Sequence, residues 1–313
     1  MSLVKEKAGA ITFGLVGFLF LVELVSGILQ GFYVPLSPAP VGHLGIKDAY
    51  VNWFEAAQLL RSAIVVPILA KCGDMFGHKR ILLIATVLTA GSTWALAFTN
   101  SFTTFLIAWA LQGFYVVWLP LEVAIIHRRT RHSGRQELLT RRGAAVLVGA
   151  LELAVIIGAL SSGLLVDTLD MNVLLALPAL VVTAVFFVIW AGIENAPGDA
   201  KGGIDWGGLA LITLALGLVM GGLVAIRIQG AGSLLAWALV LAGFVALWPF
   251  WRYEARHPDP LVDVHLLAEH RQWPVQVTAF LFGIPVLGGQ IPLSTFAQAD
   301  PAERGYGLGA DSA

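Results

Sequence analysis

The sequence consists mainly of long apolar runs with almost no charge, and this feature restricts the chain to a membrane fold. The longest run, Ile81–Leu121, contains 41 residues without an Asp, Glu, Lys or Arg. About 20 apolar residues in a helix span the hydrocarbon core of a bilayer. This run therefore predicts two crossings, which reverse at Thr99, Asn100 and Ser101. Charged residues make up only 12% of the chain, about half of the usual share in soluble domains. A water-soluble globular protein is excluded.

Seven further runs bring the prediction to an all-α integral membrane protein with about nine transmembrane helices. Three of these runs are each interrupted by one charged residue, and four carry no charge at all. In chain order they are Ala8–Pro35, Ala56–Ala70, Gly143–Val166, Met171–Ile193, Trp206–Ile226, Ile228–Trp251 and Gln272–Ala299.

The basic residues predict the side of the membrane on which each loop lies. With nine helices and a cytoplasmic N-terminus, 15 of the 19 Lys and Arg residues fall in cytoplasmic segments, three fall outside and one lies within a helix. Because cytoplasmic loops collect Lys and Arg, we expect a multi-pass protein of the cell membrane with its N-terminus in the cytoplasm. A cleaved signal peptide over Lys5–Val22 is the less favoured alternative, since the apolar run continues past Glu23 to Pro35.

Composition and motif content argue against several other functions. The net charge of −1 leaves no basic surplus for binding nucleic acid, and Cys72 is the single cysteine. The sequence has no H-E-x-x-H, G-x-S-x-G or Walker motif, so we expect neither an enzyme nor a resident cofactor. One cluster in a predicted loop has metal-ligand residue types without a tight ligand spacing, so a solvated connector is favoured there: His257, Asp259, Asp263, His265 and His270.

Polar segments divide the predicted helices into parts. Residues 194–205 are rich in Gly and Pro and predict a cytoplasmic linker. The loop His127–Arg142 carries six arginines and is interpreted as a solvated loop attracted to anionic headgroups. The expected division is 1–193 as an N-terminal six-helix bundle, 194–205 as the linker, 206–252 as two additional helices, 253–272 as a cytoplasmic loop, 273–299 as the first helix of an incomplete C-terminal bundle, and 300–313 as a polar tail.

The segment Leu69–Arg80, between the second and third predicted helices, combines an acid, a glycine and a basic pair. We expect a cytoplasmic turn of about ten residues in which Gly77 permits a tight reversal. Asp74 is expected to accept backbone N–H bonds at the start of the third helix, and Lys79 and Arg80 to lie at the headgroups. A short positive-inside loop without a special function is the alternative interpretation.

This segment resembles the signature loop of the major facilitator superfamily, which runs roughly G-x-L-a-D-r-x-G-r-k. Asp74, Gly77 and Lys79 match this pattern, whereas Ala70 and Cys72 depart from it. The resemblance implies a gating loop on the cytoplasmic side, formed by Asp74, Gly77, Lys79 and Arg80, that breaks and re-forms during alternating access.

Two later segments are similar to motifs of the same family. Gln112-Gly113 and Pro120 follow the family's R-x-x-Q-G…P pattern, with Trp109 at the position of the Arg that the resemblance links to proton coupling. In the fifth predicted helix the small residues recur every fourth position and favour close helix packing. These residues are Ala150, Ala154, Gly158 and Ser162, and Gly158 to Gly163 resembles a degenerate antiporter motif.

The segments Ile204–Gly207 and Tyr253–Asp263 resemble the 14-helix drug:proton antiporter branch of this family. The resemblance implies two additional helices between two six-helix halves, with the chain ending about five helices short of that pattern. A second chain that supplies the remaining helices is one interpretation, and a truncated chain is another.

Four ionisable residues lie within the predicted helices, where such groups are functional candidates by default. Glu23 is expected to be a protonatable carboxylate that shares a helix face with Gln30. Arg61 is expected to pair with Glu23 or Glu152. Glu122 lies near the cytoplasmic end of its helix, so a structural ion pair or a position at the membrane surface is favoured for it.

Aromatic and amide side chains complete the candidate cavity. Trp53, Phe54, Trp109, Tyr115 and Trp118 are either cavity walls or anchors at the membrane surface, and Gln112 is a further lining candidate. The resemblance implies a secondary transporter, with proton-coupled efflux of small amphipathic molecules as its expected activity. Its expected partners are the lipid bilayer, the substrate and protons. The alternative is a truncated or split membrane fragment that does not transport without a partner chain.

Overall fold

In the computed structural model, residues 2–36, 43–46, 50, 52–198, 203–299, 301 and 307–309 are described, and within them the secondary structure is helical with no strand. The helices of the first part are α1 (Ser2–Phe32), α3 (Asn52–Phe76), α4 (His78–Phe98), α5 (Phe102–Gln112), η2 (Gly113–Val117), α6 (Trp118–Arg129), α7 (Gln136–Leu165) and α8 (Met171–Gly192). Those of the second part are α9 (Trp206–Gln229), α10 (Leu234–Glu254), α11 (Val264–Ala268) and α12 (Trp273–Gln298).

These helices cover the apolar runs that the sequence predicts as crossings. Among the described residues, six helical segments are long and apolar enough to span a membrane, namely α4, the continuous run from α5 to α6, α7, α8, α9 and α10. Shorter apolar stretches occur in α1 and α12, at Val16–Phe32 and Trp273–Ile284. The expected reversal after the third crossing is present, since α4 ends at Phe98 and α5 begins at Phe102. The predicted tail 300–313 lies largely outside the described residues.

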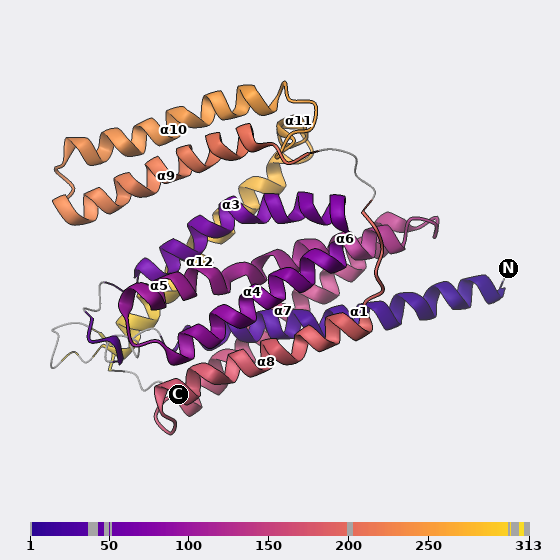
Figure 1. Ribbon diagram of the computed structural model, residues 1–313, viewed down its shortest axis with the longest axis horizontal. Coiled ribbons are helices and arrows are strands. Elements are labelled where there is room, and N and C mark those ends of the chain that lie inside the picture. The colour runs from indigo at the N-terminus through magenta and orange to yellow at the C-terminus, as the bar shows by residue number, and fades with distance from the viewer. Residues whose placement is uncertain are drawn as a thin grey trace.

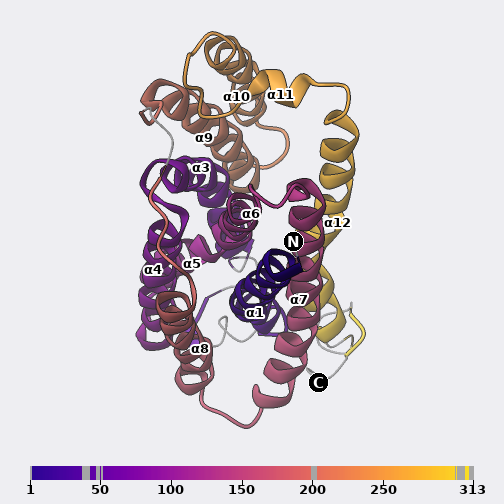
Figure 2. The same cartoon turned by 90° about the vertical axis from the view of Figure 1, so that its right-hand side faces the viewer.

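Helices α1 and α3 to α8 form one bundle, and α9 and α10 form a separate antiparallel pair beside α3 (Figures 1 and 2). Within the bundle, α1 packs mainly on α7 and also on α8 and α6, while α4 lies between α8 and α5. Helix α12 runs along the side of the bundle that α7 forms (Figure 2).

The closest helix contact joins α1 to α7 through small residues. A Cβ atom built on Gly31 of α1 would lie 2.0 Å from the carbonyl oxygen of Val155, and one on Gly158 of α7 would lie 2.7 Å from that of Ile28. Ala150, Ala154, Ser162 and Gly163 are buried on the same face of α7. Small residues let two helix backbones approach closely in a membrane.

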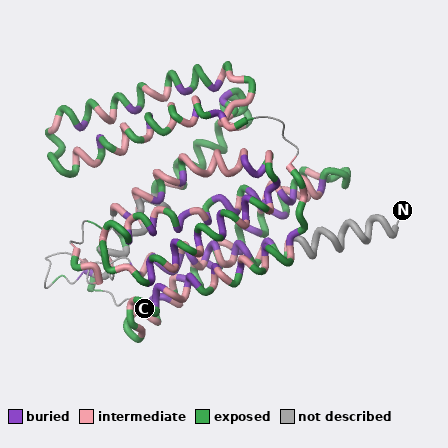
Figure 3. Tube along the Cα trace, in the orientation of Figure 1, coloured by how far each residue is buried: buried purple, intermediate pink, exposed green. Residues whose placement is uncertain are grey.

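Burial is concentrated in the bundle and sparse in the hairpin. Figure 3 shows buried positions along α1 and α4 to α6, whereas α9 and α10 are mostly exposed. Their outward side chains include Leu241, Phe244 and Trp248. Large contiguous apolar surfaces are rare on monomeric soluble proteins, and exposed apolar side chains of this kind are suited to contact with lipid.

The run from α5 to α6 changes from α-helix to 3-10 helix over Gly113–Val117. Pro120, in the first turn of α6, has no N–H with which to bond the carbonyl of Val116 one turn earlier, so the α-helical hydrogen-bond pattern is interrupted at this segment. The altered winding determines which faces of α5 and α6 point into the bundle.

Candidate functional site

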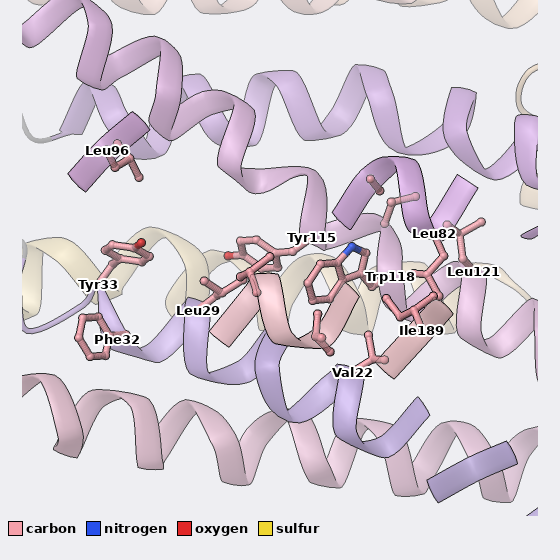
Figure 4. Packing of buried hydrophobic residues seen from close by; sticks show 14 of the residues in the cluster. Val22, Leu29, Phe32, Tyr33, Leu82, Leu96, Tyr115, Trp118, Leu121 and Ile189 are labelled. Atoms are coloured by element: carbon pink, nitrogen blue, oxygen red, sulfur yellow. The ribbon is translucent and has the colours of Figure 1, made fainter. Parts of the chain in front are cut away.

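The carboxyl groups of Glu23 and Glu122 lie inside the bundle, where α1 packs against α6. Both side chains are 0% exposed, and the two carboxyl groups are neighbours. Within the part of the chain that the structure describes, none of their four oxygens accepts a hydrogen bond. Figure 4 shows buried apolar side chains of the same two helices, among them Val22, Trp118 and Leu121.

The position of Glu122 corrects one expectation. A structural ion pair or a place at the membrane surface was expected for this residue, but it is fully buried and faces another acid. The reason is the rotation of α6 after the 3-10 segment, which turns Glu122 toward α1. Sequence reasoning placed both acids at membrane depth but had no signal that would bring them together.

Arg61 pairs with neither Glu23 nor Glu152, which also corrects an expectation. Its Nε donates to the carbonyl oxygen of Ala110 at 2.8 Å, and its guanidinium lies 4.5 Å from the centre of the Phe114 ring. Gly113 makes room for this arrangement, because a Cβ there would meet the guanidinium. Arg61 therefore binds the end of α5 at the point where the α-helix gives way to η2.

The predicted aromatic residues on α5 and η2 lie in the core and not at a membrane surface. Trp109 packs against Tyr33 and Phe54, with ring centres 4.9 and 5.6 Å away. Tyr115 is buried, and its hydroxyl accepts a hydrogen bond from Gln58 Nε2 at 3.2 Å.

Gln112 is 1% exposed, and its amide nitrogen, like the indole nitrogen of Trp109, has no hydrogen-bond partner among the described residues. These two groups lie in the same region of α5 and remain candidates for lining a site.

The remaining candidates do not join this group. Glu152 is exposed on α7, away from Arg61, and Gln30 is half-buried on α1, two turns beyond Glu23. The structure thus brings Glu23 together with Glu122, and Trp109 together with an aromatic cluster, but leaves Glu152 on the outside of this chain.

The predicted gating loop is shorter than expected. Helix α3 continues to Phe76 and α4 begins at His78, so Gly77 is the single residue between them. It has a φ of +100°, as the tight reversal requires. Asp74 does not cap α4, because it lies in the last turn of α3, where its carboxylate contacts His78 Nε2 at 3.1 Å.

The segment that leaves α8 runs directly over this joint. A Cβ on Gly77 would lie 2.5 Å from the carbonyl oxygen of Ala196, and one on Gly198 would lie 2.0 Å from that of Met75. Lys79 Nζ donates to the carbonyl oxygen of Trp190 at 2.8 Å. Arg80 is exposed. The joint between α3 and α4 is therefore in contact with the start of the linker, which the sequence did not predict.

A second polar cluster connects the start of α9 to the end of α10. Asp205 caps α9 by accepting from the Gly208 amide at 2.9 Å, and Tyr253 Oη donates to the same carboxylate at 3.0 Å. Glu254 accepts from the Val262 amide at 2.9 Å. These contacts join the start of α9 to the end of α10.

The acids and histidines of the loop after α10 contact different partners, and His257 Nδ1 lies 3.7 Å from Asp205 Oδ2. Asp259 pairs with Lys71 of α3 at 3.0 Å, Asp263 caps α11, and His257 stacks on Tyr253. Among the described residues, no group of three His, Cys, Asp or Glu side chains is placed to hold a metal ion.

Comparison of the sequence with known protein families identifies the family to which this bundle belongs. The sequence matches the Major Facilitator Superfamily over residues 19–309. The chain belongs to this superfamily. This is a superfamily of transporters.

Similar proteins of this superfamily are also transporters by name. The chain is 27% identical over 272 residues to the uridine/deoxyuridine transporter of Lactococcus lactis subsp. cremoris (strain MG1363), covering 83% of this chain and 53% of that protein. It is 25% identical over 282 residues to the tetracenomycin C resistance and export protein of Streptomyces glaucescens, covering 87% and 51%. The chain spans about half the length of these curated relatives.

A solved structure shows the same fold. The POT family transporter PepTSo aligns with a TM-score of 0.52 at 16% sequence identity, covering 80% of this chain and 56% of that one. At this identity the similarity concerns the fold of the superfamily alone.

Proposed function

We propose that this chain contributes the N-terminal part of a secondary active transporter that exports small amphipathic molecules in exchange for protons. Residues 1–193 are its first bundle, 206–252 an additional helix pair and 273–299 the first helix of a second bundle. The N-terminus is cytoplasmic and the protein resides in the cell membrane. Similarity to an export protein and to drug efflux pumps supports efflux as the direction.

The observation that carries proton coupling is the burial of Glu23 at membrane depth without a basic partner among the described residues. An acid in this position exchanges a proton when the cavity opens to water, and the change of its charge favours one bundle arrangement over the other. The joint at Gly77, with Asp74, Lys79 and Arg80, is the cytoplasmic element that re-forms in each cycle. Further helices beyond those of the residues described here complete the two bundles around a midplane site.

Transport in proteoliposomes that contain this chain together with the further helices of the transporter tests this proposal. We expect ethidium, a lipophilic cation, to move against its gradient when a proton gradient is imposed and to stop when a protonophore is added. Radiolabelled uridine serves as a comparison substrate, because one relative is a uridine transporter. We expect Glu23→Gln to reduce the rate of proton-driven ethidium transport at least tenfold.

The matched control is Glu137→Gln, since Glu137 is exposed in the first turn of α7. If Glu23→Gln transports as well as this control, Glu23 is not the coupling group. If the unaltered chain moves neither probe with any gradient, the non-transporting fragment is the correct alternative.

A further inference from the structure

We infer that Glu23 and Glu122 together form one proton-binding site, in which the two carboxyl groups share a proton across the contact between α1 and α6. Glu122 thereby gains a direct role in proton binding. The role of this pair in transport rests on the function proposed above, whereas its sharing of a proton does not.

The geometry of the two carboxyl groups carries the inference. They come from different helices, both side chains are 0% exposed, and the groups are neighbours. In the described part of the chain none of the four oxygens accepts a hydrogen bond, although the Ser26 hydroxyl lies close to Glu23. A buried polar group without a partner is costly, and a proton placed between the two carboxyl groups supplies the missing hydrogen bond to both.

Among the described residues, no basic side chain forms an ion pair with either acid. Helix α8 contains no ionisable residue, and the acid within the apolar part of α7, Glu152, is exposed. Arg61 of α3 is bound to the carbonyl of Ala110. The basic residues of α4, α6 and α7 lie in their cytoplasmic turns, namely His78, Lys79, Arg80, His127, Arg128, Arg129, Arg141 and Arg142.

Two neighbouring carboxylates in a medium of low dielectric constant cannot both be ionised at neutral pH. With one proton, the protonated carboxyl donates its O–H to the other carboxylate and the pair carries a charge of −1. With two protons the pair is neutral. The pair therefore alternates between −1 and 0 by gaining or losing one proton, and its two titration steps belong to the pair and not to either residue.

Infrared spectroscopy of the purified full chain in nanodiscs tests this sharing directly. The carbonyl stretch of protonated carboxylic acids is followed from acid to alkaline pH, and the spectrum of the Glu23→Gln/Glu122→Gln double variant is subtracted to remove all other acids. We expect the unaltered protein to show two steps separated by more than about one pH unit, as strong coupling requires. Each single variant should show one step, with its midpoint between those two.

Independent acids would give a different result. In that case each single variant loses one step and leaves the other at its original midpoint, and this outcome overturns the inference. A single step, or no protonated band, in the unaltered protein also overturns it. Glu122→Asp should retain two steps, and Glu137→Gln should leave both steps in place.

The titration and the transport assay can fail separately. Two coupled steps without proton-driven transport would leave the shared site in place and reject the proposed function. Proton-driven transport with independent titration would reject the shared site and leave the proposed function in place. Size-exclusion profiles and helix content identify folded variants. If Glu23→Gln does not fold, the difference between the unaltered protein and Glu122→Gln alone shows whether removal of one acid shifts the titration of the other.

Discussion

At the scale of single residues, glycines at the contact between α1 and α7 allow the two helix backbones to approach closely. Gly31 and Gly158 each face backbone atoms of the other helix, so neither position has space for a Cβ atom. Gly149 belongs to the same helix as Gly158, yet an added Cβ there would meet nothing within 4 Å. The two positions on α7 thus share a helix and differ in their surroundings.

We predict that Gly158→Leu lowers the free energy of unfolding by about 1–3 kcal/mol, because the added side chain forces apart the closely packed contact between α1 and α7. Gly149→Leu should change it by less than about 0.5 kcal/mol, as is usual for an exposed substitution. Thermal unfolding of both variants in detergent, followed by tryptophan fluorescence, provides the comparison. Equal effects of the two substitutions would show that α1 and α7 do not pack through this face.

The residues also show which parts of the site could be read from the sequence. Hydropathy is a local property, so Glu23, Arg61 and Glu122 could be assigned to membrane depth from the runs around them. Their partners could not, because these depend on the rotation of each helix about its axis. Arg61 binds a carbonyl made accessible by Gly113, and Glu122 faces Glu23 only after the change of winding before α6.

At the scale of elements, the hairpin of α9 and α10 and the loop that follows it contact the bundle near both ends of α3. Near one end, Lys71 pairs with Asp259 at 3.0 Å. Near the other, the guanidinium of Arg227 lies 5.2 Å from the centre of the Trp53 ring. The sequence predicts these two helices as an addition to the bundle, but the hydropathy runs contain no information on which helix they lie against.

We predict a measurable coupling between Lys71 and Asp259 in a double-mutant cycle with alanine. The pair is partly exposed, so the coupling free energy should be about 0.2–1 kcal/mol and should decrease at high salt. Thermal or denaturant unfolding of the two single variants and the double variant gives this quantity. Arg80 with Asp259 is the control pair and should give additive effects, since Arg80 is exposed and makes no such contact among the described groups.

The joint between α3 and α4 shows where a local pattern misleads. Polar and glycine residues in Leu69–Arg80 predict a loop, yet helix continues on both sides of Gly77. Asp74 and His78 stabilise the two helix ends across the joint, and the linker carbonyls contact it from above. The glycine itself was identified correctly, because its requirement for a positive φ is a property of that one residue.

At the scale of the whole molecule, the number and order of helices follow from the apolar runs, and the distribution of basic residues predicts their orientation. The bundle arrangement is that of the Major Facilitator Superfamily. The side of the membrane on which each loop lies is a separate property that can be measured with introduced cysteines.

We predict that a membrane-impermeant maleimide labels Ala231→Cys but not His132→Cys on intact cells, in a chain whose Cys72 is replaced by Ser. Ala231 lies between α9 and α10, and His132 in the arginine-rich loop after α6, and both are exposed. Both variants should be labelled once the membrane is permeabilised. Labelling of His132→Cys in intact cells would place the N-terminus outside.

The long contact between α1 and α7 has a consequence for synthesis. More than 100 residues separate Phe32 from Gln136, so at about 5–20 residues per second the ribosome needs roughly 5–20 s to add them. During this interval α1 carries Glu23 at membrane depth without the helices that later enclose it. Insertion of an isolated acid costs about 2.5–3.5 kcal/mol. The first helix must therefore be held at the site of insertion until its partners emerge, which makes the timing of translation part of how this protein reaches its fold.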